Sequence, residues 1–482
     1  MIGKYFPRPC RSKTVSIAAG AWLIVAAATL NVSSQSEKPG APLVSGQVVN
    51  VVSATDSTQS YSLYLPSIYA PSKRWPMIYF FDPGGHGERP VELYKDIAEK
   101  YGFIFAGSNN SRNFSSDQAA SVNAIWQDAH LRLAIDEHRT YVSGFSGGAR
   151  VAGAMALNCS QCQIAGVVAH GAGYPSGKPN TKDHLLYYLA VGDRDFNWPE
   201  VVSVRRERED KGLPYRVRVY SGTHQWAPAD VMEDAVQWFI LHSMQSGDVP
   251  RRPEFIEQSF QALQTRAEDA EKRSDPLSQL AAFRSLVSDF AGLKDVKDFE
   301  VKLELLKKSP ALKKALKQEH DQIEEQFALE REISPKLRAY VDGNSPDQTS
   351  LRVEIVQAMA RLKDRSIHEK DEGKRLVYSR AFDDMHVEGI ENGQQELQSR
   401  HFEKAETCFQ LMAEVTDGPW PVLLLAETHA ATGKKKQAIA DLQQAVRRGL
   451  NDADAIESNR QFDVLKSEPE FQKLLADLRS QR

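Results

Sequence analysis

The sequence predicts an α/β fold, with a sheet that carries helices on both faces, followed by an all-α domain. Between residues 44 and 245, short apolar runs rich in β-branched and aromatic residues alternate with amphipathic helical patterns. Such alternation is typical of a mostly parallel sheet covered on both faces. Beyond residues 250–253, which read Pro-Arg-Arg-Pro, the composition shifts to Leu, Ala, Glu, Lys and Gln at helical spacing. We therefore expect a domain boundary there.

Length and charge narrow the class of protein. A chain of 482 residues exceeds what one ordinary hydrophobic core organises, so more than one domain is expected. The composition, 41% hydrophobic and 26% charged, is typical of a globular protein. The formal net charge of -4 argues against a nucleic-acid partner held by phosphate contacts.

The first residues have the layout of a signal peptide. Basic side chains precede an uncharged run at Val15–Val32, and a polar segment follows it. The run is shorter than the ~20 apolar residues of a membrane-spanning helix, but Trp22 and a weak cleavage context leave an uncleaved anchor open. We expect residues 1–34 to be a signal peptide or N-terminal anchor and the protein to be periplasmic or secreted. Membrane contact is expected only if the segment is uncleaved.

The cysteines fit an oxidising compartment. Cys10 would leave with the signal peptide, so Cys159, Cys162 and Cys408 remain. A disulfide between Cys159 and Cys162 is favoured. A redox pair is the weaker alternative, because Cys159 lies at a helix end, where the dipole raises a thiol pKa. No second cysteine pair completes a zinc site, and neither a metal nor a cofactor is expected.

Eight strands and four helices are predicted between residues 44 and 245. The strands are Val48–Ser53, Tyr61–Leu65, Met77–Phe81, Phe103–Gly107, Thr140–Ser143, Ile164–Ala169, Leu185–Val191 and Arg216–Tyr220. The helices are Pro90–Tyr101, Val122–Glu137, Ala149–Leu157 and Asp230–His242.

The strongest single motif is Gly144-Phe145-Ser146-Gly147-Gly148, which lies between a predicted strand and a predicted helix. A G-x-S-x-G sequence at such a turn is typical of a nucleophile elbow, where glycines permit a strained serine and close packing of its neighbours. The N-terminus of the following helix favours developing negative charge. A glycine-rich loop with an ordinary serine is the alternative. We predict that Ser146 is a nucleophile.

A serine nucleophile needs a base, which is expected on a loop after the last strand. His224 directly follows the strand Arg216–Tyr220 and precedes the last helix of the domain. The other histidines of this region lie in or beside apparent strands and helices: His130, His138, His170 and His184. Position therefore favours His224.

The acid that orients the histidine is expected after the preceding strand, where Asp193 and Asp195 follow Leu185–Val191. The order Ser, Asp, His is that of α/β-hydrolases and differs from the orders in chymotrypsin and subtilisin. Many hydrolases of this fold have a Gly-x-x-Asp turn at this position. That resemblance favours Asp195 and leaves Asp193 as a turn or salt-bridge residue.

Stabilisation of the tetrahedral intermediate requires an oxyanion hole. One donor is expected to be the backbone N–H of Gly147, which follows the nucleophile. The other is expected from the loop Asp82–Gly87, with Gly84 and Gly85 as equal candidates. His86 in the same loop is a candidate substrate contact or a solvent-facing side chain.

Residues 45–245 resemble bacterial exported hydrolases related to feruloyl esterases and polyhydroxyalkanoate depolymerases. The resemblance rests on Phe81-Asp82-Pro83, Ser108-Asn109-Asn110-Ser111-Arg112-Asn113, the Ser146 elbow, Asp195-Phe196-Asn197-Trp198-Pro199-Glu200 and Gly222-Thr223-His224-Gln225-Trp226. It implies hydrolysis of carboxylic esters. Asp82-Pro83 replaces a His-Gly pair frequent in better-known esterases.

Three further residues are candidate substrate contacts. Arg112 follows a strand at the edge where open α/β sheets bind ligands, so it would grip a substrate carboxylate or else belong to a loop that caps its neighbours. Trp198 and Trp226 flank the acid and the base. They would form an aromatic wall or serve as packing anchors.

The C-terminal half is predicted to be helical throughout. Residues 254–384 are expected to form charged amphipathic helices, and residues 385–482 resemble tetratricopeptide repeats. Aligned positions at a spacing close to one repeat are Arg400 with Gly433, Ala405 with Ala438, Phe409 with Leu442 and Met412 with Ala445. A plain helical bundle is the alternative.

These features predict an exported serine hydrolase that acts on a small-molecule or polymer ester through an acyl-enzyme on Ser146. A serine peptidase or acyltransferase with the same triad is one alternative. A non-catalytic scaffold that binds a protein partner through its helical repeats is the other.

Overall fold

The computed structural model describes residues 43–480, except residues 116, 160, 176–183 and 345. The chain divides into two compact units, Met1–Leu316 and Lys317–Arg482. The signal peptide or anchor predicted at residues 1–34 lies outside the described residues. Within the described part of the chain, no helix has an apolar stretch long enough to span a membrane.

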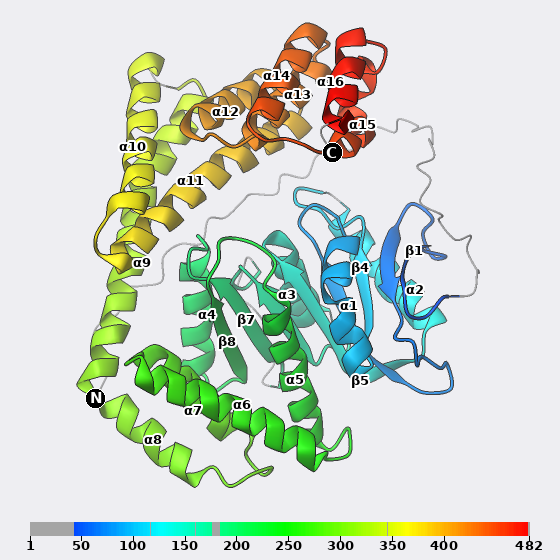
Figure 1. The fold of residues 1–482 in the computed structure, drawn as a ribbon, viewed down its shortest axis with the longest axis vertical. Helices are drawn as coiled ribbons and strands as arrows, with labels where there is room; N and C mark the ends of the chain where they lie inside the picture. Colours follow the sequence, from blue (N-terminus) through cyan, green and yellow to red (C-terminus); the bar gives the residue numbers. More distant parts are fainter. Residues whose placement is uncertain (1–42, 116, 160, 176–183, 345, 481–482) are drawn as a thin grey trace. The chain divides into compact units, whose positions relative to one another are not determined.

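The first unit contains one eight-stranded sheet, and all eight predicted strands are present (Figure 1). The strands are β1 Val48–Val52, β2 Ser60–Tyr64, β3 Trp75–Phe81, β4 Ile104–Ser108, β5 Ile135–Phe145, β6 Gly166–His170, β7 Leu186–Gly192 and β8 Tyr215–Tyr220. Their order is β1-β2-β4-β3-β5-β6-β7-β8. Strand β2 is antiparallel to both neighbours, and the strands from β4 to β8 are parallel. This is the sheet of an α/β-hydrolase fold.

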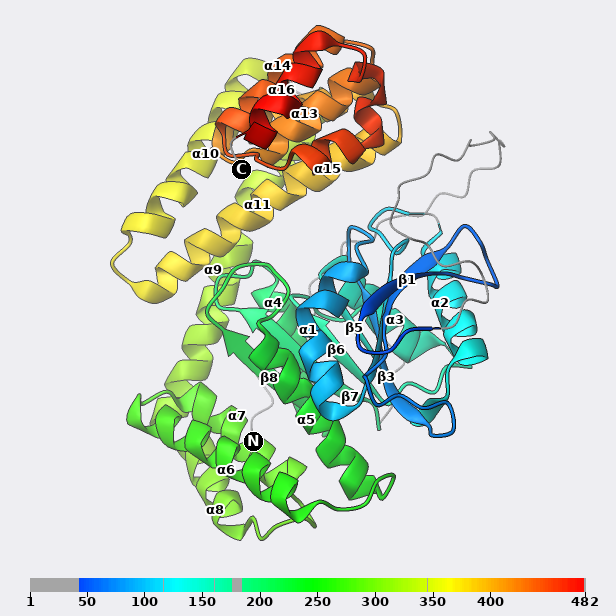
Figure 2. The same cartoon turned by 45° about the vertical axis from the view of Figure 1, so that its right-hand side comes forward.

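Helices cover both faces of the sheet, as predicted (Figure 2). They are α1 Glu88–Tyr101, α2 Gln118–Arg132, α3 Gly147–Asn158, α4 Trp198–Asp210 and α5 Ala229–Ser246. Alternate residues of β3 enter two different cores: Ile78 and Phe80 pack with α1 and α5, whereas Tyr79 and Phe81 pack with α2 and α3. Because successive side chains of a strand point to opposite faces, β3 contributes to the hydrophobic cores on both sides of the sheet.

Two helix predictions need correction. The predicted helix Val122–Glu137 is too long, because α2 ends at Arg132 and β5 begins at Ile135. Helix α4 was not predicted. Its buried Arg208 donates to the carbonyl oxygens of Leu185 and Pro214, so a charged residue occupies a position where the helical pattern requires an apolar one.

Three further helices belong to the first unit: α6 Pro253–Lys272, α7 Pro276–Asp289 and α8 Lys297–Lys308. Their apolar side chains continue the core formed by α1 and α5, with Phe260 and Phe283 in the same cluster as Phe239. The composition shift at residues 250–253 therefore marks the end of the alternation of strands and helices. The boundary between the two compact units lies later in the chain, between Leu316 and Lys317.

The second unit consists of helices in the described residues. Helix α9, Pro310–Val341, leads into it, and the remaining elements are α10 Gln348–His368, α11 Glu372–Gln398, α12 Phe402–Val415, α13 Trp420–Ala431, α14 Lys435–Arg447, α15 Ala453–Ser458, the 3-10 helix η1 Arg460–Leu465 and α16 Pro469–Ser480. Ala405 and Ala438, aligned in the sequence, are both fully buried. Arg400 and Gly433 both turn the chain between two helices with positive φ, 60° and 73°.

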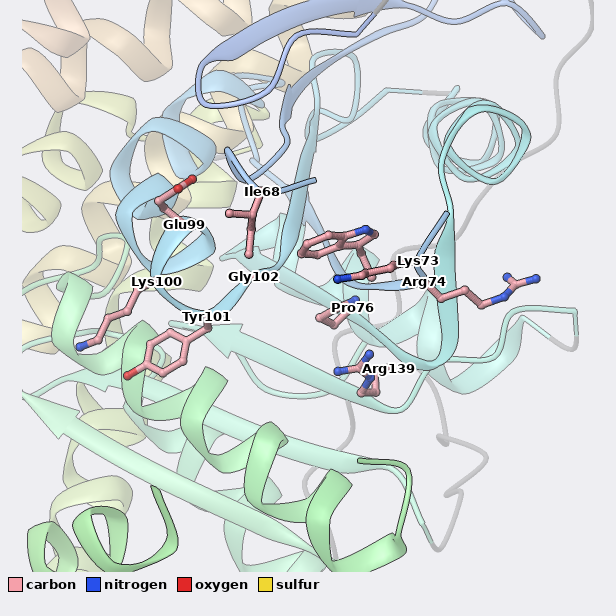
Figure 3. A pocket seen from close by; sticks show the side chains of 10 residues that line it. Ile68, Lys73, Arg74, Pro76, Glu99, Lys100, Tyr101, Gly102 and Arg139 are labelled. Atoms are coloured by element: carbon pink, nitrogen blue, oxygen red, sulfur yellow. The ribbon is translucent and has the colours of Figure 1, made fainter. Parts of the chain in front are cut away.

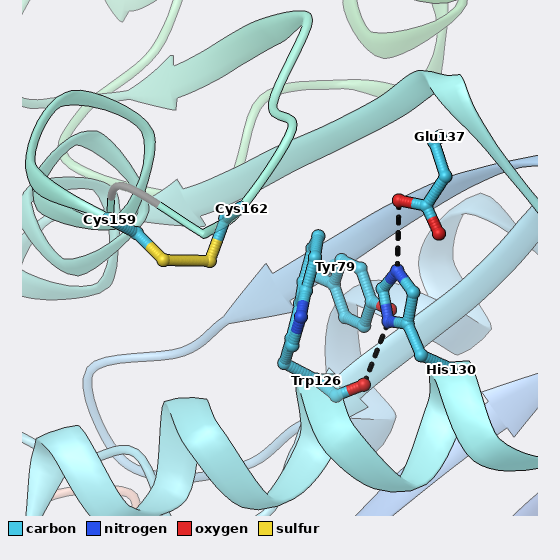
Figure 4. Close-up of a disulfide and its surroundings, with 6 residues drawn as sticks. All are labelled: Tyr79, Trp126, His130, Glu137, Cys159 and Cys162. Carbon is cyan, nitrogen blue, oxygen red and sulfur yellow. Dashed lines mark hydrogen bonds and ion pairs between the residues drawn. A yellow bond between two sulfur atoms is a disulfide. The ribbon is translucent and has the colours of Figure 1, made fainter.

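The disulfide between Cys159 and Cys162 is present at the end of α3 (Figure 4). Cys408 is free and buried, and burial raises the pKa of its thiol. Figure 4 also shows His130, whose Nδ1 donates to the carbonyl oxygen of Trp126 at 2.8 Å. His130 therefore belongs to the packing of α2 rather than to an open site.

Candidate active site

Ser146 forms the turn between β5 and α3 in a strained backbone conformation. Its φ is 53° and its ψ is -121°, an uncommon combination for a residue other than glycine. Its N–H donates to the carbonyl oxygen of His170 at 2.9 Å, which ties the turn to the end of β6. A strained backbone conformation persists only where the surrounding structure fixes it, and such residues cluster at functional sites.

Glycines on both sides of Ser146 allow this turn to approach its neighbours. A Cβ atom at Gly144 would lie 2.2 Å from the carbonyl oxygen of Gly148. One at Gly148 would lie 1.9 Å from the carbonyl oxygen of Phe81, the last residue of β3. Any side chain at these two positions would collide with the neighbouring backbone. The predicted elbow therefore requires glycine at both positions for steric reasons.

His224 and Asp195 form a hydrogen-bonded pair. The Nδ1 of His224 lies 2.9 Å from Oδ1 of Asp195 and donates to it, since an ionised carboxylate only accepts. The Asp195 side chain is fully buried, and its Oδ1 also accepts from the backbone N–H of Asn197 at 2.9 Å. The Asn197 N–H therefore holds the Asp195 carboxylate in place together with the imidazole. The other ring nitrogen of His224, Nε2, lies outside this pair and can bind a second partner.

Two aromatic rings hold the imidazole beside the elbow. The centroid of the His224 ring lies 4.5 Å from that of Phe145 and 4.2 Å from that of Phe196. Phe145 immediately precedes Ser146, so β5 brings the imidazole to the serine. No hydrogen bond joins the Ser146 hydroxyl to His224 among the described residues. In enzymes without substrate, such bonds are frequently long and tighten on binding.

Asp193, the other acid considered, occupies a turn. Its Oδ1 accepts from the backbone N–H of Gly222 at 3.0 Å, and Arg194 lies 3.8 Å away. It connects the loops that follow β7 and β8 and makes no hydrogen bond to His224 among the described residues. Of the two aspartates, Asp195 is the one paired with the histidine.

Gly171 is a site residue that the sequence did not reveal. It follows β6 with a φ of 59°. A Cβ atom there would lie 2.6 Å from Oδ2 of Asp195 and 3.1 Å from Nδ1 of His224. The only sequence signal was the glycine after the strand-like run that ends at Ala169.

The loop after β3 is folded around the buried carboxylate of Asp82. Its Oδ1 accepts from the N–H of Gly84 at 2.8 Å, and its Oδ2 accepts from Nε1 of Trp226 at 2.9 Å. The N–H of Gly85 donates to the carbonyl oxygen of Asp82 at 3.0 Å. Both glycine amides that were predicted to serve the oxyanion hole are thus engaged within the loop.

Asn113 is the second site residue that sequence reasoning missed. Its N–H donates to the carbonyl oxygen of Pro83 at 2.8 Å, and Arg112 forms a β-bridge with Gly84. A Cβ atom at Gly147 would lie 1.9 Å from Oδ1 of Asn113, so the asparagine side chain covers the residue after Ser146. The sequence had placed Asn109–Asn113 at the correct sheet edge without separating Asn113 from its neighbours.

Arg112 and His86 are exposed beside the glycine loop. The imidazole Cδ2 of His86 lies 2.7 Å from the position of a Cβ on Gly84, and Nε of Arg112 lies 3.6 Å from that on Gly85. The Arg112 guanidinium takes part in no ion pair among the residues described. Two basic side chains therefore border the loop.

The two tryptophans differ in their surroundings. Trp226 is buried and packs on Phe80 and His170, and its Nε1 donates a hydrogen bond to Asp82. Of the two alternatives, an aromatic wall or a packing anchor, Trp226 is the packing anchor. Trp198 is half-buried at the start of α4 and packs against the core on the α3 side of the sheet.

His170 is a packing residue rather than a second base. Its side chain is fully buried, and burial lowers the pKa of the imidazole to about 3. Its Nε2 lies 3.2 Å from the hydroxyl oxygen of Ser143, and its ring packs on Trp226. The neutral imidazole fills the space below the elbow.

A separate cavity of about 290 Å³ lies near the opposite edge of the sheet, where β3 begins and α1 ends. Lys73, Arg74, Lys100 and Arg139 line it. Figure 3 shows Lys100 and Arg74 pointing to opposite sides, so these two cations do not converge on one ligand position, and Lys100 is paired with Glu233. The carboxyl edge of the sheet, which carries Ser146, remains the candidate site.

No protein-family model matches the chain, and none of the curated proteins matches its sequence. Similar solved structures include a ferulic acid esterase, with 15% identity, coverage of 39% of this chain and 94% of that chain, and a TM-score of 0.31. An S-formylglutathione hydrolase from Staphylococcus aureus has 13% identity, coverage of 40% and 95%, and a TM-score of 0.34. Est1E from Butyrivibrio proteoclasticus has 13% identity, coverage of 39% and 95%, and a TM-score of 0.31. The strand order of the sheet itself carries the assignment of the fold.

Proposed function

We propose that this protein hydrolyses carboxylic esters through an acyl-enzyme on Ser146. One observation carries the proposal: a buried carboxylate, Asp195, holds Nδ1 of His224, and the imidazole packs on the residue before a strained serine. A serine, a base and an orienting acid in this order are the parts that nucleophilic acyl transfer requires.

The reaction follows from the roles of these groups. His224 Nε2 takes the hydroxyl proton while Ser146 Oγ attacks the ester carbonyl, and the imidazolium returns that proton to the leaving alkoxide. An acyl-serine and a free alcohol result. A water molecule then attacks the acyl carbon with His224 again as the base, and the carboxylic acid leaves as Ser146 regains its proton. Asp195 stays ionised throughout and fixes the imidazole tautomer.

The exposed side chain of Arg112 beside the glycine loop indicates a preference for one class of substrate. Arg112 is exposed and without an ion pair among the described residues, beside Gly85 and next in sequence to Asn113, whose side chain covers Gly147. We infer that it binds a negatively charged group of a small or polymeric ester. A serine peptidase or acyltransferase would use the same triad, so profiling of esters, peptides and acyl acceptors separates these activities.

Labelling with a fluorophosphonate probe tests the proposal directly, because the probe forms a covalent bond only with an activated serine. The folded mature chain should be labelled and should hydrolyse a short-chain nitrophenyl ester. Ser146→Ala should lose both properties, and heat-denatured wild type serves as the control for nonspecific labelling. Undiminished labelling of Ser146→Ala would refute the assignment of the nucleophile.

The remaining proposals concern location and partner. We propose that the protein is exported to the periplasm or secreted, which the Cys159–Cys162 disulfide supports. Membrane attachment would follow only if residues 1–34 are retained.

We also propose that residues 385–482 form tetratricopeptide-like helix pairs that bind a protein partner. The equivalent buried positions Ala405 and Ala438 and a cavity of about 600 Å³ lined by Gln394, Glu427 and Gln461 support this. A scaffold without catalysis would retain this binding and lack ester hydrolysis.

A further inference from the structure

The candidate site has one backbone donor for an oxyanion where two donors are needed. The N–H of Gly147 follows the nucleophile at the start of α3. The second donor normally comes from the loop after β3, but here Gly84 donates to Oδ1 of Asp82 and Gly85 donates to the Asp82 carbonyl oxygen. The N–H of His86 also lies 3.4 Å from Oδ1 of Asp82. Use of any of these amides would break the loop's own hydrogen bonds.

The side chain of Asn113 occupies the space that this loop leaves above Gly147. Its Oδ1 lies 1.9 Å and its Nδ2 lies 2.9 Å from the position that a Cβ of Gly147 would take. Both ends of the amide are therefore next to the residue that provides the first donor. Rotation about the Cβ–Cγ bond of an asparagine exchanges its oxygen and nitrogen without moving the rest of the side chain.

A tight turn fixes Asn113 in this place. The N–H of Ser115 donates to the carbonyl oxygen of Arg112 at 3.3 Å and closes the turn around Asn113 and Phe114. Phe114 has a φ of 62°, which is unusual for a bulky residue. The N–H of Asn113 and Nε2 of Gln118 add hydrogen bonds on either side, to Pro83 and to Arg112. The backbone is committed, whereas no described residue bonds to the side-chain amide.

We propose that the Asn113 side-chain amide is the second donor of the oxyanion hole. This rests on the proposed function, since an oxyanion forms only if Ser146 attacks a carbonyl. Nδ2–H would point at the tetrahedral oxygen together with the N–H of Gly147. A fixed, otherwise uncommitted amide costs little reorganisation when charge develops, which is what makes such a donor effective.

Substitution of Asn113 tests this inference. Asn113→Ala should lower kcat about 10²- to 10³-fold with little change in KM, because the donor acts on the transition state. Asn113→Asp keeps the shape of the side chain but removes both N–H groups and should lose at least as much. Ser115→Ala, in the same turn, should retain wild-type kinetics. It keeps the backbone N–H that closes the turn and removes only the hydroxyl that accepts from the N–H of Asp117 at 3.1 Å, on the side away from Asn113 in the sequence.

A transition-state analogue separates this role from a structural one. The affinity of a trifluoromethyl ketone, which forms a tetrahedral adduct with the serine, should fall in Asn113→Asp by the same factor as kcat/KM. The melting temperature should stay near that of wild type. Retention of kcat within about threefold in Asn113→Ala, or unchanged analogue affinity in an impaired variant, would overturn the inference. If wild type itself neither hydrolyses esters nor reacts with the fluorophosphonate, the proposed function fails, and Asn113 has no oxyanion to stabilise.

Discussion

Two buried aspartates at the candidate site perform different tasks. Asp82 uses both oxygens within the structure, accepting from Gly84 and from Trp226, so it shapes the loop after β3. Asp195 directs one oxygen to Asn197 and His224, and its Oδ2 lies against Gly171 without a hydrogen-bond donor among the described residues. A buried carboxylate needs compensating donors. The histidine is therefore one of the groups that satisfy Asp195, and the pair holds a defined geometry.

Conversion of each aspartate after β7 to asparagine should separate catalysis from turn formation. Asp195→Asn should lower kcat by about two to four orders of magnitude, because the amide no longer fixes the imidazole tautomer. Asp193→Asn is the matched control and should stay within about threefold, because an amide oxygen can still accept from Gly222. Steady-state kinetics on a nitrophenyl ester measure both effects. The reverse ranking of the two variants would assign the role to Asp193.

At the residue scale, the sequence offered candidates only for those parts of the candidate site that have fixed places in the chain. Ser146, Asp195 and His224 each follow a predicted strand, and parallel strands end at one edge of the sheet. Asn113 and Gly171 were missed because their places beside Gly147, Asp195 and His224 depend on contacts between distant segments. The engagement of the Gly84 amide could not be predicted either, since it depends on the conformation of the Asp82 side chain.

At the element scale, a buried ion cluster joins β8, α5, α6 and α7. Arg216 lies 3.3 Å from Asp234 and 2.6 Å from Asp289, and Arg266 lies 2.6 Å from Asp234. Burial alone would raise the pKa of Asp234, but Arg216 and Arg266 outweigh it and lower the pKa to about 2. The carboxylates are therefore charged near neutral pH, and α7 supplies one of the two that compensate Arg216.

Removal of one carboxylate should destabilise the first unit strongly. Asp289→Ala leaves the buried Arg216 with a single partner, and loss of one member of a buried pair costs about 3–5 kcal/mol. Glu304→Ala is the control, because its pair with Lys307 is exposed to solvent and such pairs add little to stability. Denaturant melts of both variants in the full chain measure the difference. Equal stability of the two variants would show that α7 is only loosely attached.

Elements were predictable where apolar periodicity is regular. All eight strands were found because the central strands β3, β4, β6 and β7 are buried on both faces and the strands are rich in Val, Ile, Phe and Tyr. Helix α4 was missed because a hydrogen-bonded arginine, Arg208, takes a core position. A charged side chain can be buried when backbone carbonyl oxygens accept hydrogen bonds from it. A helix with such a residue in its core face cannot be recognised from the periodicity of its hydrophobic residues.

At the scale of the whole molecule, composition and compactness divide the chain at different places. The sequence changes character at residues 250–253, where the alternation of strands and helices ends. The helices that follow nevertheless pack their apolar faces onto the core beneath α5, and their side chains complete the ion cluster. Composition reports the kind of secondary structure, whereas a unit boundary depends on which core a helix covers.

Truncation after each boundary should therefore give opposite results. A chain of residues 40–316 retains α6–α8 and should be soluble, melt cooperatively, and react with the fluorophosphonate as the full mature chain does. A chain of residues 40–248 uncovers the part of the core on which α6–α8 pack and removes Asp289 from the buried Arg216. Exposed apolar surface and an undercompensated buried charge both favour unfolding and aggregation.

Size-exclusion chromatography, thermal melts and probe labelling of the two truncated chains measure the outcome. A soluble, cooperatively melting and labelled 40–248 chain would show that α6–α8 are an appendage and that the fold is complete at α5. A folded but unlabelled 40–316 chain, beside a labelled full chain, would instead place part of the catalytic machinery in residues 317–482. If neither result is obtained, residues 40–316, helices α6–α8 included, are the smaller active chain, and residues 40–248 do not suffice.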